Sequence, residues 1–230
     1  MTTFGILGAG QAGATLARVS VDAGYDVVIA NSRGPETLAG LVRELGPKAR
    51  AATVSEAAAA ADFAILAFPY VPGTRLPVED LAGKVVIDNN NYMVWRDGHY
   101  PEVDSGQKTV HELRQEQLPA SKIVKAFSHV QFHERHPIRV PSDRLPAIVR
   151  LAWPAGAPDR KALVVSSDHP EAVEFVTAFY DDLGFDAVDN SPLSESWRSA
   201  PGTPMWKGSV DGQSRDELIA NLKRAERVIA

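Results

Sequence analysis

Cysteine is absent from the 230 residues of this chain. Disulfide bridges, thiolate zinc sites, iron–sulfur clusters and a cysteine nucleophile are therefore excluded. No apolar run approaches the roughly 20 residues that a membrane-spanning helix needs. Neither sign of charge dominates, because 24 basic residues face 29 acidic ones, and the net charge of -5 gives no reason to expect a nucleic-acid partner. The remaining composition, 44% hydrophobic and 23% charged, is that of an ordinary globular protein.

The N-terminus has no basic leader, and an apolar run begins almost at once with Phe4. A secretory signal combines a basic region with a longer apolar segment, so we expect none here. The expected location is cytoplasmic, without a membrane partner.

The first ninety residues alternate short apolar runs with helix-like stretches. Runs that are apolar on both faces and separated by helices indicate a parallel sheet covered on both sides. Helices are expected at 11–23, from 34 to about 45, and after a cap at Ser55. Strands are expected at 4–7, 26–30, 50–53, 63–68 and 84–88. This pattern predicts the α/β class, with a Rossmann-type doubly wound parallel sheet.

Beyond residue 88 the rhythm changes, with loop-rich stretches at 89–107 and 129–146. Apolar runs and a helical period then return. The expected elements are a helix at 109–117, strands at 123–127, 162–165 and 185–188, and helices at 170–183 and 213–229. We therefore predict a doubly wound domain at 1–128 and a smaller C-terminal α/β part at 129–230 that packs on it.

A G-x-G-x-x-G motif follows the first predicted strand and opens the first helix. In that setting Gly8 allows a tight turn, Gly10 lets the main chain approach a pyrophosphate, and Gly13 lets helix and strand pack closely. The helix N-terminus adds free N–H groups and a partial positive charge. The alternative is a glycine-rich turn without a ligand. The predicted phosphate contacts are Gly8, Gly10, Gln11, Ala12 and Gly13.

The end of the second predicted strand reads Asn31-Ser32-Arg33. An NAD site usually places Asp or Glu there to bind the adenine ribose, and this chain has neither. Arginine offers a forked cation that suits a 2′-phosphate. The turn therefore favours NADP(H) over NAD(H), although an ordinary polar turn has the same composition.

The fourth and fifth strands end where the nicotinamide half of a dinucleotide lies. Phe68, Pro69 and Tyr70 close the fourth strand, and Asn89 follows the fifth. Phe68 is equally suited to the core, so Pro69 and Tyr70 are the better candidates for bordering a ligand. Asn89 is the best of three consecutive asparagines for a ligand contact; the other two suit either a ligand amide or a turn.

The histidines cluster between 111 and 136, but the spacing of His129, His133 and His136 matches no zinc signature, so no metal site is predicted. No G-x-S-x-G elbow supports a hydrolase.

The stretch from 122 to 150 contains six basic residues and only two acidic ones. This excess of positive charge suits either a lip for an anionic ligand or a solvated loop. These basic residues are Lys122, Lys125, Arg135, Arg139, Arg144 and Arg150.

Residues 4–13, 31–33 and 61–69 together resemble the NADP oxidoreductases that use coenzyme F420. Residues 123–128 and 191–196 are similar to the sixth strand and the C-terminal proline–leucine turn of that family. The resemblance implies an enzyme that passes hydride between NADP(H) and a deazaflavin, with F420 as the second cofactor. It also implies a homodimer, for which exposed Trp197 and Trp206 are the candidate surface.

In that family the deazaflavin would lie over the nicotinamide, here near Pro69, Asn89, Ser128 and His129. Asn89 and His129 are the residues expected at the reacting centre. A deazaflavin needs little acid–base help, whereas a carbonyl or imine needs a proton donor, for which His129 or Tyr92 is the candidate.

Two other functions share the same nucleotide motifs. One is an NADPH-dependent reductase of a small carbonyl, imine or quinone substrate; the imine and β-hydroxyacid enzymes of this kind have a long all-helical C-terminal domain, whereas this chain predicts strands there. The other is a non-catalytic module that senses NADP(H). The oxidation of NADPH distinguishes them, because a sensor binds NADPH without oxidising it and the enzymes oxidise it.

Overall fold

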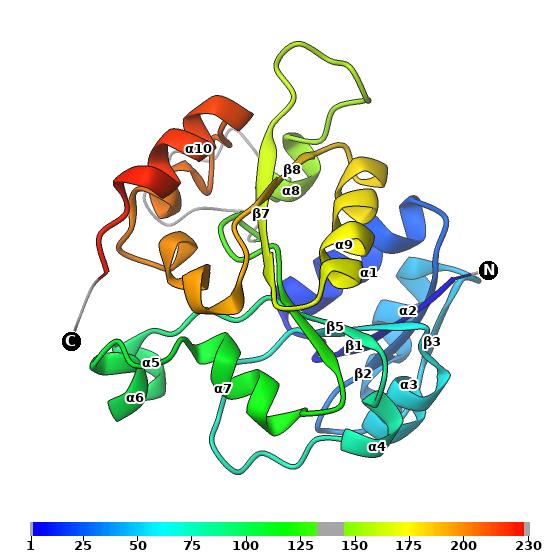
Figure 1. Cartoon of the computed structure of the whole chain (residues 1–230). Helices are drawn as coiled ribbons and strands as arrows, with labels where there is room; N and C mark the ends of the chain where they lie inside the picture. Colours follow the sequence, from blue (N-terminus) through cyan, green and yellow to red (C-terminus); the bar gives the residue numbers. More distant parts are fainter. Residues whose placement is uncertain (1, 133–144, 228–230) are drawn as a thin grey trace.

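The computed structural model describes residues 2–132 and 145–227. Within those ranges eight strands form one sheet in the order β3-β2-β1-β4-β5-β6-β7-β8 (Figure 1). Neighbouring strands are parallel except β6 and β7, which are antiparallel. The strands are β1 (Thr3–Leu7), β2 (Asp26–Ala30), β3 (Ala49–Ala51), β4 (Phe63–Leu66), β5 (Val85–Asp88), β6 (Lys122–Lys125), β7 (Ala162–Ser167) and β8 (Asp186–Asp189). The predicted doubly wound α/β fold is confirmed.

Helices cover both faces of this sheet. The α-helices are α1 (Gln11–Asp22), α2 (Ala39–Leu45), α3 (Val54–Ala60), α4 (Val78–Leu81), α5 (Val94–Asp97), α6 (Pro101–Asp104), α7 (Val110–Gln117), α8 (Ala147–Arg150), α9 (Pro170–Asp182) and α10 (Arg215–Arg224). Three 3-10 helices are also described, η1 (Pro35–Leu38), η2 (Leu193–Ser199) and η3 (Pro204–Gly208). The short helices α5 and α6 therefore replace parts of the stretch expected as a loop at 89–107.

Alternate residues of the central strands enter two separate apolar cores. Val27 and Ile29 of β2 pack in the core that contains α1 and α9, whereas Val28 and Ala30 pack in the core that contains α3. Side chains of a strand alternate between the two faces of a sheet, so a strand buried on both sides must be apolar throughout. This explains why the strands could be recognised as continuous apolar runs.

The alanine-rich helix α3 packs very close to β1. A Cβ atom on Gly5 would lie 2.5 Å from the carbonyl oxygen of Ala57, so only small residues fit at this contact. The helix begins two residues earlier than predicted, because Thr53 rather than Ser55 is its N-cap. The Thr53 hydroxyl accepts from the Glu56 N–H at 3.3 Å, and the Glu56 carboxylate accepts from the Thr53 N–H at 2.9 Å, forming a capping box.

The C-terminal part of the chain extends the same sheet. β7, α9 and β8 form a parallel unit that joins β6 in the antiparallel sense, and α9 lies beside α1 (Figure 1). Phe175 of α9 stacks on Phe63 with ring centroids 3.5 Å apart, and Phe179 contacts Phe4 at 4.6 Å. The last helix, α10, is shorter than the predicted 213–229; it is capped by Ser214. Among the described residues no helix has both the length and the apolar character needed to cross a membrane.

Candidate functional site

The glycine loop between β1 and α1 is shaped by contacts within the protein at two of its three glycines. Gly8 has a φ of +109°, and a Cβ there would lie 2.7 Å from the carbonyl oxygen of Ala67. A Cβ on Gly13 would lie 1.9 Å from the carbonyl oxygen of Gly8. At Gly10, in contrast, a Cβ would meet nothing within 4 Å. Nothing in the described chain demands glycine at that position, so it leaves free space beside the main chain.

Helix α1 begins at this free space without a side-chain cap. Its first N–H groups, at Gln11, Ala12 and Gly13, have no intrahelical acceptor, because the first turn of any helix lacks one. A helix N-terminus with free N–H groups and room beside a glycine fits a pyrophosphate. The residues present therefore fit the dinucleotide that the motif predicts.

The turn after β2 presents two exposed side chains, Ser32 and Arg33. Asn31 shapes the turn: its Oδ1 accepts from the Arg33 N–H at 2.9 Å, and its Nδ2 donates to Thr37 Oγ1 at 2.9 Å. Asn31, which the sequence predicts as a cofactor contact, thus also holds the turn in shape. Arg33 makes no ion pair with the described residues. Its guanidinium is thus free to meet a phosphate.

A cavity of about 250 Å³ lies beside the glycine loop, at the carboxyl ends of β1, β4, β5 and β6. It brings together most of the residues predicted near the nicotinamide. Residues of its wall include Ala12, Phe68, Pro69, Asn89, Asn90 and Ser128. Phe68 serves both predicted purposes, since it is also packed against an apolar core. This smaller cavity therefore lies where the sequence predicts the nicotinamide half of a dinucleotide.

Buried polar atoms in the smaller cavity lack partners. Asn90 Nδ2 is a donor and Ser128 Oγ both a donor and an acceptor, and neither makes a hydrogen bond. Buried polar groups are nearly always hydrogen-bonded, so these atoms indicate a polar ligand. A carboxamide, which offers one acceptor and one donor group, fits them. The neighbouring Phe127 has a φ of +57°, a left-handed conformation that is uncommon for non-glycine residues and tends to occur at functional sites.

A second cavity, of about 560 Å³, adjoins the first and shares Asn91, Met93 and Trp206 with it. Its wall is mostly apolar, with the aromatic residues Tyr92, Trp95, Trp197 and Trp206. The predicted exposure of Trp197 and Trp206 is wrong, because both are half-buried in this wall. The dimer surface inferred from them therefore loses its basis.

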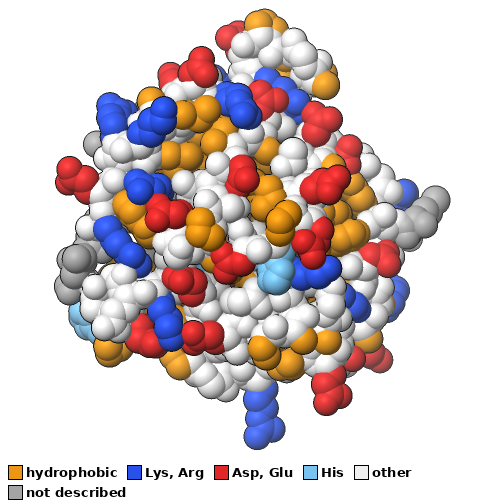
Figure 2. All heavy atoms as spheres, in the orientation of Figure 1, with side chains coloured by type: hydrophobic (Ala, Val, Ile, Leu, Met, Phe, Trp, Pro, Cys, Tyr) orange, Lys and Arg blue, Asp and Glu red, His pale blue; other side chains and the backbone are white. Residues whose placement is uncertain are grey.

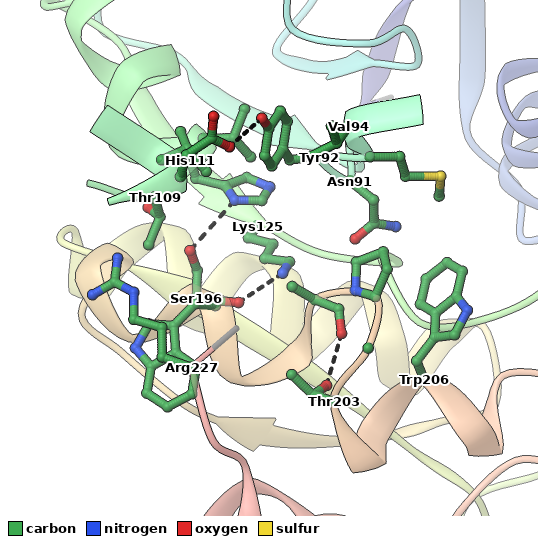
Figure 3. Close-up of a pocket in the computed structure, with 18 of the residues that line it drawn as sticks. Asn91, Tyr92, Val94, Thr109, His111, Lys125, Ser196, Thr203, Trp206 and Arg227 are labelled. Carbon is green, nitrogen blue, oxygen red and sulfur yellow. Dashed lines mark hydrogen bonds between the residues drawn. The ribbon is translucent and has the colours of Figure 1, made fainter. Parts of the chain in front are cut away.

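Lys125 is the buried cation of the larger cavity (Figure 3). It ends β6, pairs in register with Asp88 of β5, and its Nζ donates to the carbonyl oxygen of Ser196 at 2.7 Å. Burial lowers the pKa of Lys125 from its usual 10.5 to about 7, and the charge of Asp88 opposes that shift. An ammonium group with such a pKa exchanges protons near neutral pH.

His111 of α7 faces the same cavity. Its Nδ1 lies 3.4 Å from Ser196 Oγ, whereas its Nε2 makes no hydrogen bond of ordinary length (Figure 3). Burial and the positive charges of Lys125 and Arg114 lower the pKa of His111 well below its usual value, and the nearby main chain of Asn90 opposes this. The imidazole is therefore neutral at pH 7.

A fully buried ion pair fixes α7 against the sheet. Arg114 Nε donates to Asp88 Oδ2 at 3.0 Å, and the guanidinium lies 5.2 Å from the ring centres of both Phe68 and Tyr70. Tyr70 packs in an apolar cluster with residues of α7 and lines neither of the two cavities. The prediction that Tyr70 borders the ligand is not supported, because its ring packs against α7 instead.

His129 does not have the geometry of the predicted proton donor. It is buried, its Nε2 accepts from the Val164 N–H at 2.9 Å, and burial lowers the pKa of the imidazole to about 3. It lines neither the smaller nor the larger cavity. His129 is thus a neutral structural histidine that ties the end of β6 to β7.

Tyr92, the other proposed proton donor, lines the larger cavity. Its hydroxyl donates a hydrogen bond to Asp104 Oδ1 at 2.5 Å. Burial and this carboxylate raise the pKa of Tyr92 to about 12. The hydroxyl is therefore occupied within the protein.

Two of the six basic residues predicted as a lip have other surroundings. Lys125 is buried, and Lys122 pairs with Glu171 at 3.1 Å. Among the described residues no group of three or more side chains is placed to hold a metal ion. The predicted positions that lie outside the described residues are His133, His136, Arg135, Arg139 and Arg144.

On the face shown in Figure 2, acidic and basic side chains are interspersed with apolar ones.

The sheet order, the glycine loop and the cavity beside it define a dinucleotide-binding protein of the Rossmann type. Residues 3–92 match the family described as NADP oxidoreductase, coenzyme F420-dependent. The resemblance predicted from the sequence is thereby confirmed. This match indicates an NAD(P)-dependent oxidoreductase, and solved structures share the fold of the chain.

Individual proteins are similar to different extents. The Escherichia coli K12 protein YjhV is 38% identical over 72 residues, which are 31% of this chain and 47% of that protein. Among solved structures, the hypothetical protein SMa0349 from Sinorhizobium meliloti is 29% identical, with a TM-score of 0.66 over 89% of this chain and 93% of that one. A proposed F420-dependent NADP reductase from Arthrobacter sp. FB24 is 23% identical, with a TM-score of 0.65 over 85% and 87%.

Proposed function

We propose that this protein transfers hydride between NADP(H) and a second, flat substrate bound in the larger cavity. One observation carries the proposal: the cavity beside the glycine loop adjoins a larger apolar cavity and shares Asn91, Met93 and Trp206 with it. Hydride transfer requires two ring systems to meet face to face, and most of its catalysis comes from holding them in that position. Two adjoining cavities, one at the nucleotide motif, provide such an arrangement.

The nucleotide side of the proposal assigns separate tasks to separate residues. The N–H groups of Gln11, Ala12 and Gly13 bind the pyrophosphate, and Ser32 and Arg33 bind the 2′-phosphate that distinguishes NADP(H) from NAD(H). The bound dinucleotide supplies or accepts the hydride.

In the smaller cavity, Asn90 and Ser128 offer the buried donor and acceptor groups that hold a carboxamide in one orientation. Pro69 and Phe68 give this cavity an apolar wall. An apolar wall keeps water from the reacting atoms, and this is the contribution that the protein makes to chemistry carried by a cofactor.

Coenzyme F420 is the first acceptor to test, because the matched family is described as F420-dependent. The aromatic wall of the larger cavity is suited to a deazaflavin ring. A small carbonyl, imine or quinone is the second candidate, and the buried Lys125 at this cavity favours it. A sensor that binds NADP(H) without turnover is the remaining alternative.

The test is to mix the protein with F420 and either NADPH or NADH under anaerobic conditions and to follow the deazaflavin absorbance. The proposal with F420 predicts fast bleaching with NADPH and little with NADH. If NADPH binds by fluorescence but no bleaching occurs, the deazaflavin is not the acceptor and carbonyl, imine and quinone compounds are tested next. Binding of NADPH without oxidation by any acceptor identifies a sensor, and absence of NADPH binding refutes the proposed function.

A further inference from the structure

The larger cavity contains buried polar atoms that the nucleotide does not explain. Lys125 carries three N–H donors, and among the described residues only the carbonyl of Ser196 accepts one of them. His111 Nε2 and Asn91 Oδ1 are buried and make no hydrogen bond. Buried donors and acceptors are seldom left unpaired. Three such groups on a mostly apolar wall therefore indicate a ligand with one polar atom and an apolar body.

A purely structural role does not account for Lys125. Lys84 shows what a structural lysine looks like in this fold: its Nζ donates to the carbonyl oxygens of both Ala58 and Ala59, at 2.7 and 3.1 Å. Lys125 has one such contact and is more deeply buried. Nor does an ion pair explain it, because the carboxylate of the neighbouring Asp88 is bonded to Arg114 and to the Asn90 N–H.

We propose that Lys125 is the catalytic proton donor of this enzyme, that His111 hydrogen-bonds the same substrate atom, and that the substrate is an apolar or aromatic carbonyl or imine compound. The inference rests on the proposed function, since NADPH supplies the hydride. The new C–H bond forms at the carbon of C=O or C=N as its π electrons move to the oxygen or nitrogen. That atom takes a proton from the Lys125 ammonium, giving an alcohol or an amine, and the neutral lysine regains a proton from water.

Burial and one charge set the response of Lys125 to pH. Burial favours the neutral amine, whereas Asp88 of β5 favours the ammonium form; His111 of α7 and His129 after β6 are both neutral at pH 7. With its pKa lowered to about 7, Lys125 loses its proton as the pH rises above neutral. Reduction of a carbonyl or imine therefore slows above about pH 7, and the reverse oxidation, which needs the neutral amine, speeds up.

The experiment compares Lys125→Met with Lys84→Met as the matched control, because both remove a lysine that donates to main-chain carbonyls. NADPH oxidation is measured with three probes, benzaldehyde, 2-methyl-1-pyrroline and 9,10-phenanthrenequinone, and F420 reduction is measured in parallel. General acid catalysis contributes about 100-fold or more, so Lys125→Met is expected to lower kcat on an active carbonyl or imine probe by at least that factor. Lys84→Met and the F420 reaction are expected to change little.

Folding and nucleotide binding are checked by circular dichroism and NADPH fluorescence, and His111→Gln serves as a second variant if Lys125→Met does not fold. The expected signature is retained NADPH binding, lost reduction of the probe and disappearance of the kcat inflection near pH 7. An unchanged kcat and pH profile in Lys125→Met overturns the proton-donor role. A wild-type protein that binds NADPH but reduces none of the three probes overturns the substrate class, whereas one that does not bind NADPH refutes the proposed function instead.

Discussion

The guanidinium of Arg114 and the carboxylate of Asp88 meet at 3.0 Å with neither side chain exposed to solvent. This pair connects the end of β5 to α7, and α7 also carries His111, three residues before Arg114. The position of one wall of the larger cavity therefore depends on a contact outside it. Arg114 is held in addition between the rings of Phe68 and Tyr70.

Asp88→Asn is expected to destabilise the protein by about 3–5 kcal/mol, since it leaves the charge of Arg114 buried and unpaired. The free energy of unfolding in urea measures the effect. Glu44→Gln is the control, because Glu44 pairs with Arg18 at 3.2 Å on the exposed surface and such pairs contribute roughly 0–1 kcal/mol. Equal effects of the two substitutions would show that the buried pair has no special importance.

The pKa of Lys125 predicts how stability depends on pH. The folded state binds its proton less tightly than the unfolded state, with a pKa of about 7 against the usual 10.5. The unfolded state therefore holds more protons between these values, and stability must rise with pH across that interval. Relative to Lys125→Met, the wild type is expected to gain unfolding free energy from about pH 7 to about pH 10.5, and the difference to stay constant below pH 7. A difference that is independent of pH would contradict the lowered pKa.

Gly10→Ala is expected to weaken NADPH binding by about tenfold or more, because the added methyl group occupies the space that the pyrophosphate needs. Folding should be unaffected, as a Cβ at this position meets no protein atom within 4 Å. Gly40→Ala on α2 is matched in this respect, since its Cβ also meets nothing within 4 Å. Fluorescence titration with NADPH compares the two, and similar affinities would place the nucleotide elsewhere.

Arg33→Ala is expected to lower the affinity for NADPH by about tenfold or more and to leave NADH binding nearly unchanged. The reason is that only NADPH carries the 2′-phosphate. Arg43→Ala, which removes an exposed arginine from the neighbouring helix α2, controls for the loss of positive charge. Parallel losses with both nucleotides would show that Arg33 does not discriminate between them.

The nucleotide half of the site was predictable because it depends on strand order alone. Parallel strands bring their carboxyl ends to one edge, so the sequence alone predicts that Pro69, Asn89 and Ser128 lie near Gly8–Gly13. The larger cavity was not predictable in this way. By composition Lys125 is only one of several basic residues, although its position within the apolar run 123–127 is the signal that marks it.

The errors have a common cause, which is that local patterns do not specify what packs against them. The family resemblance places His129 at the reacting centre, but the left-handed turn at Phe127 and the hydrogen bond from the Val164 N–H place it between strands. His111 gains its neighbours Lys125 and Ser196 only when η2 packs on α7 and β6.

Because β7 joins the sheet in the antiparallel sense, two separate parts of the chain form the glycine loop and one wall of the larger cavity. β7 and β8 run opposite to the other strands, so the segment that follows β8 must cross back over β6, and there it supplies Ser196, Trp197 and Trp206 to the larger cavity. The nucleotide loop and the η2–η3 segment are thus independent in sequence. Substitutions in η2, which borders the larger cavity and not the smaller one, change the larger cavity while the glycine loop stays intact.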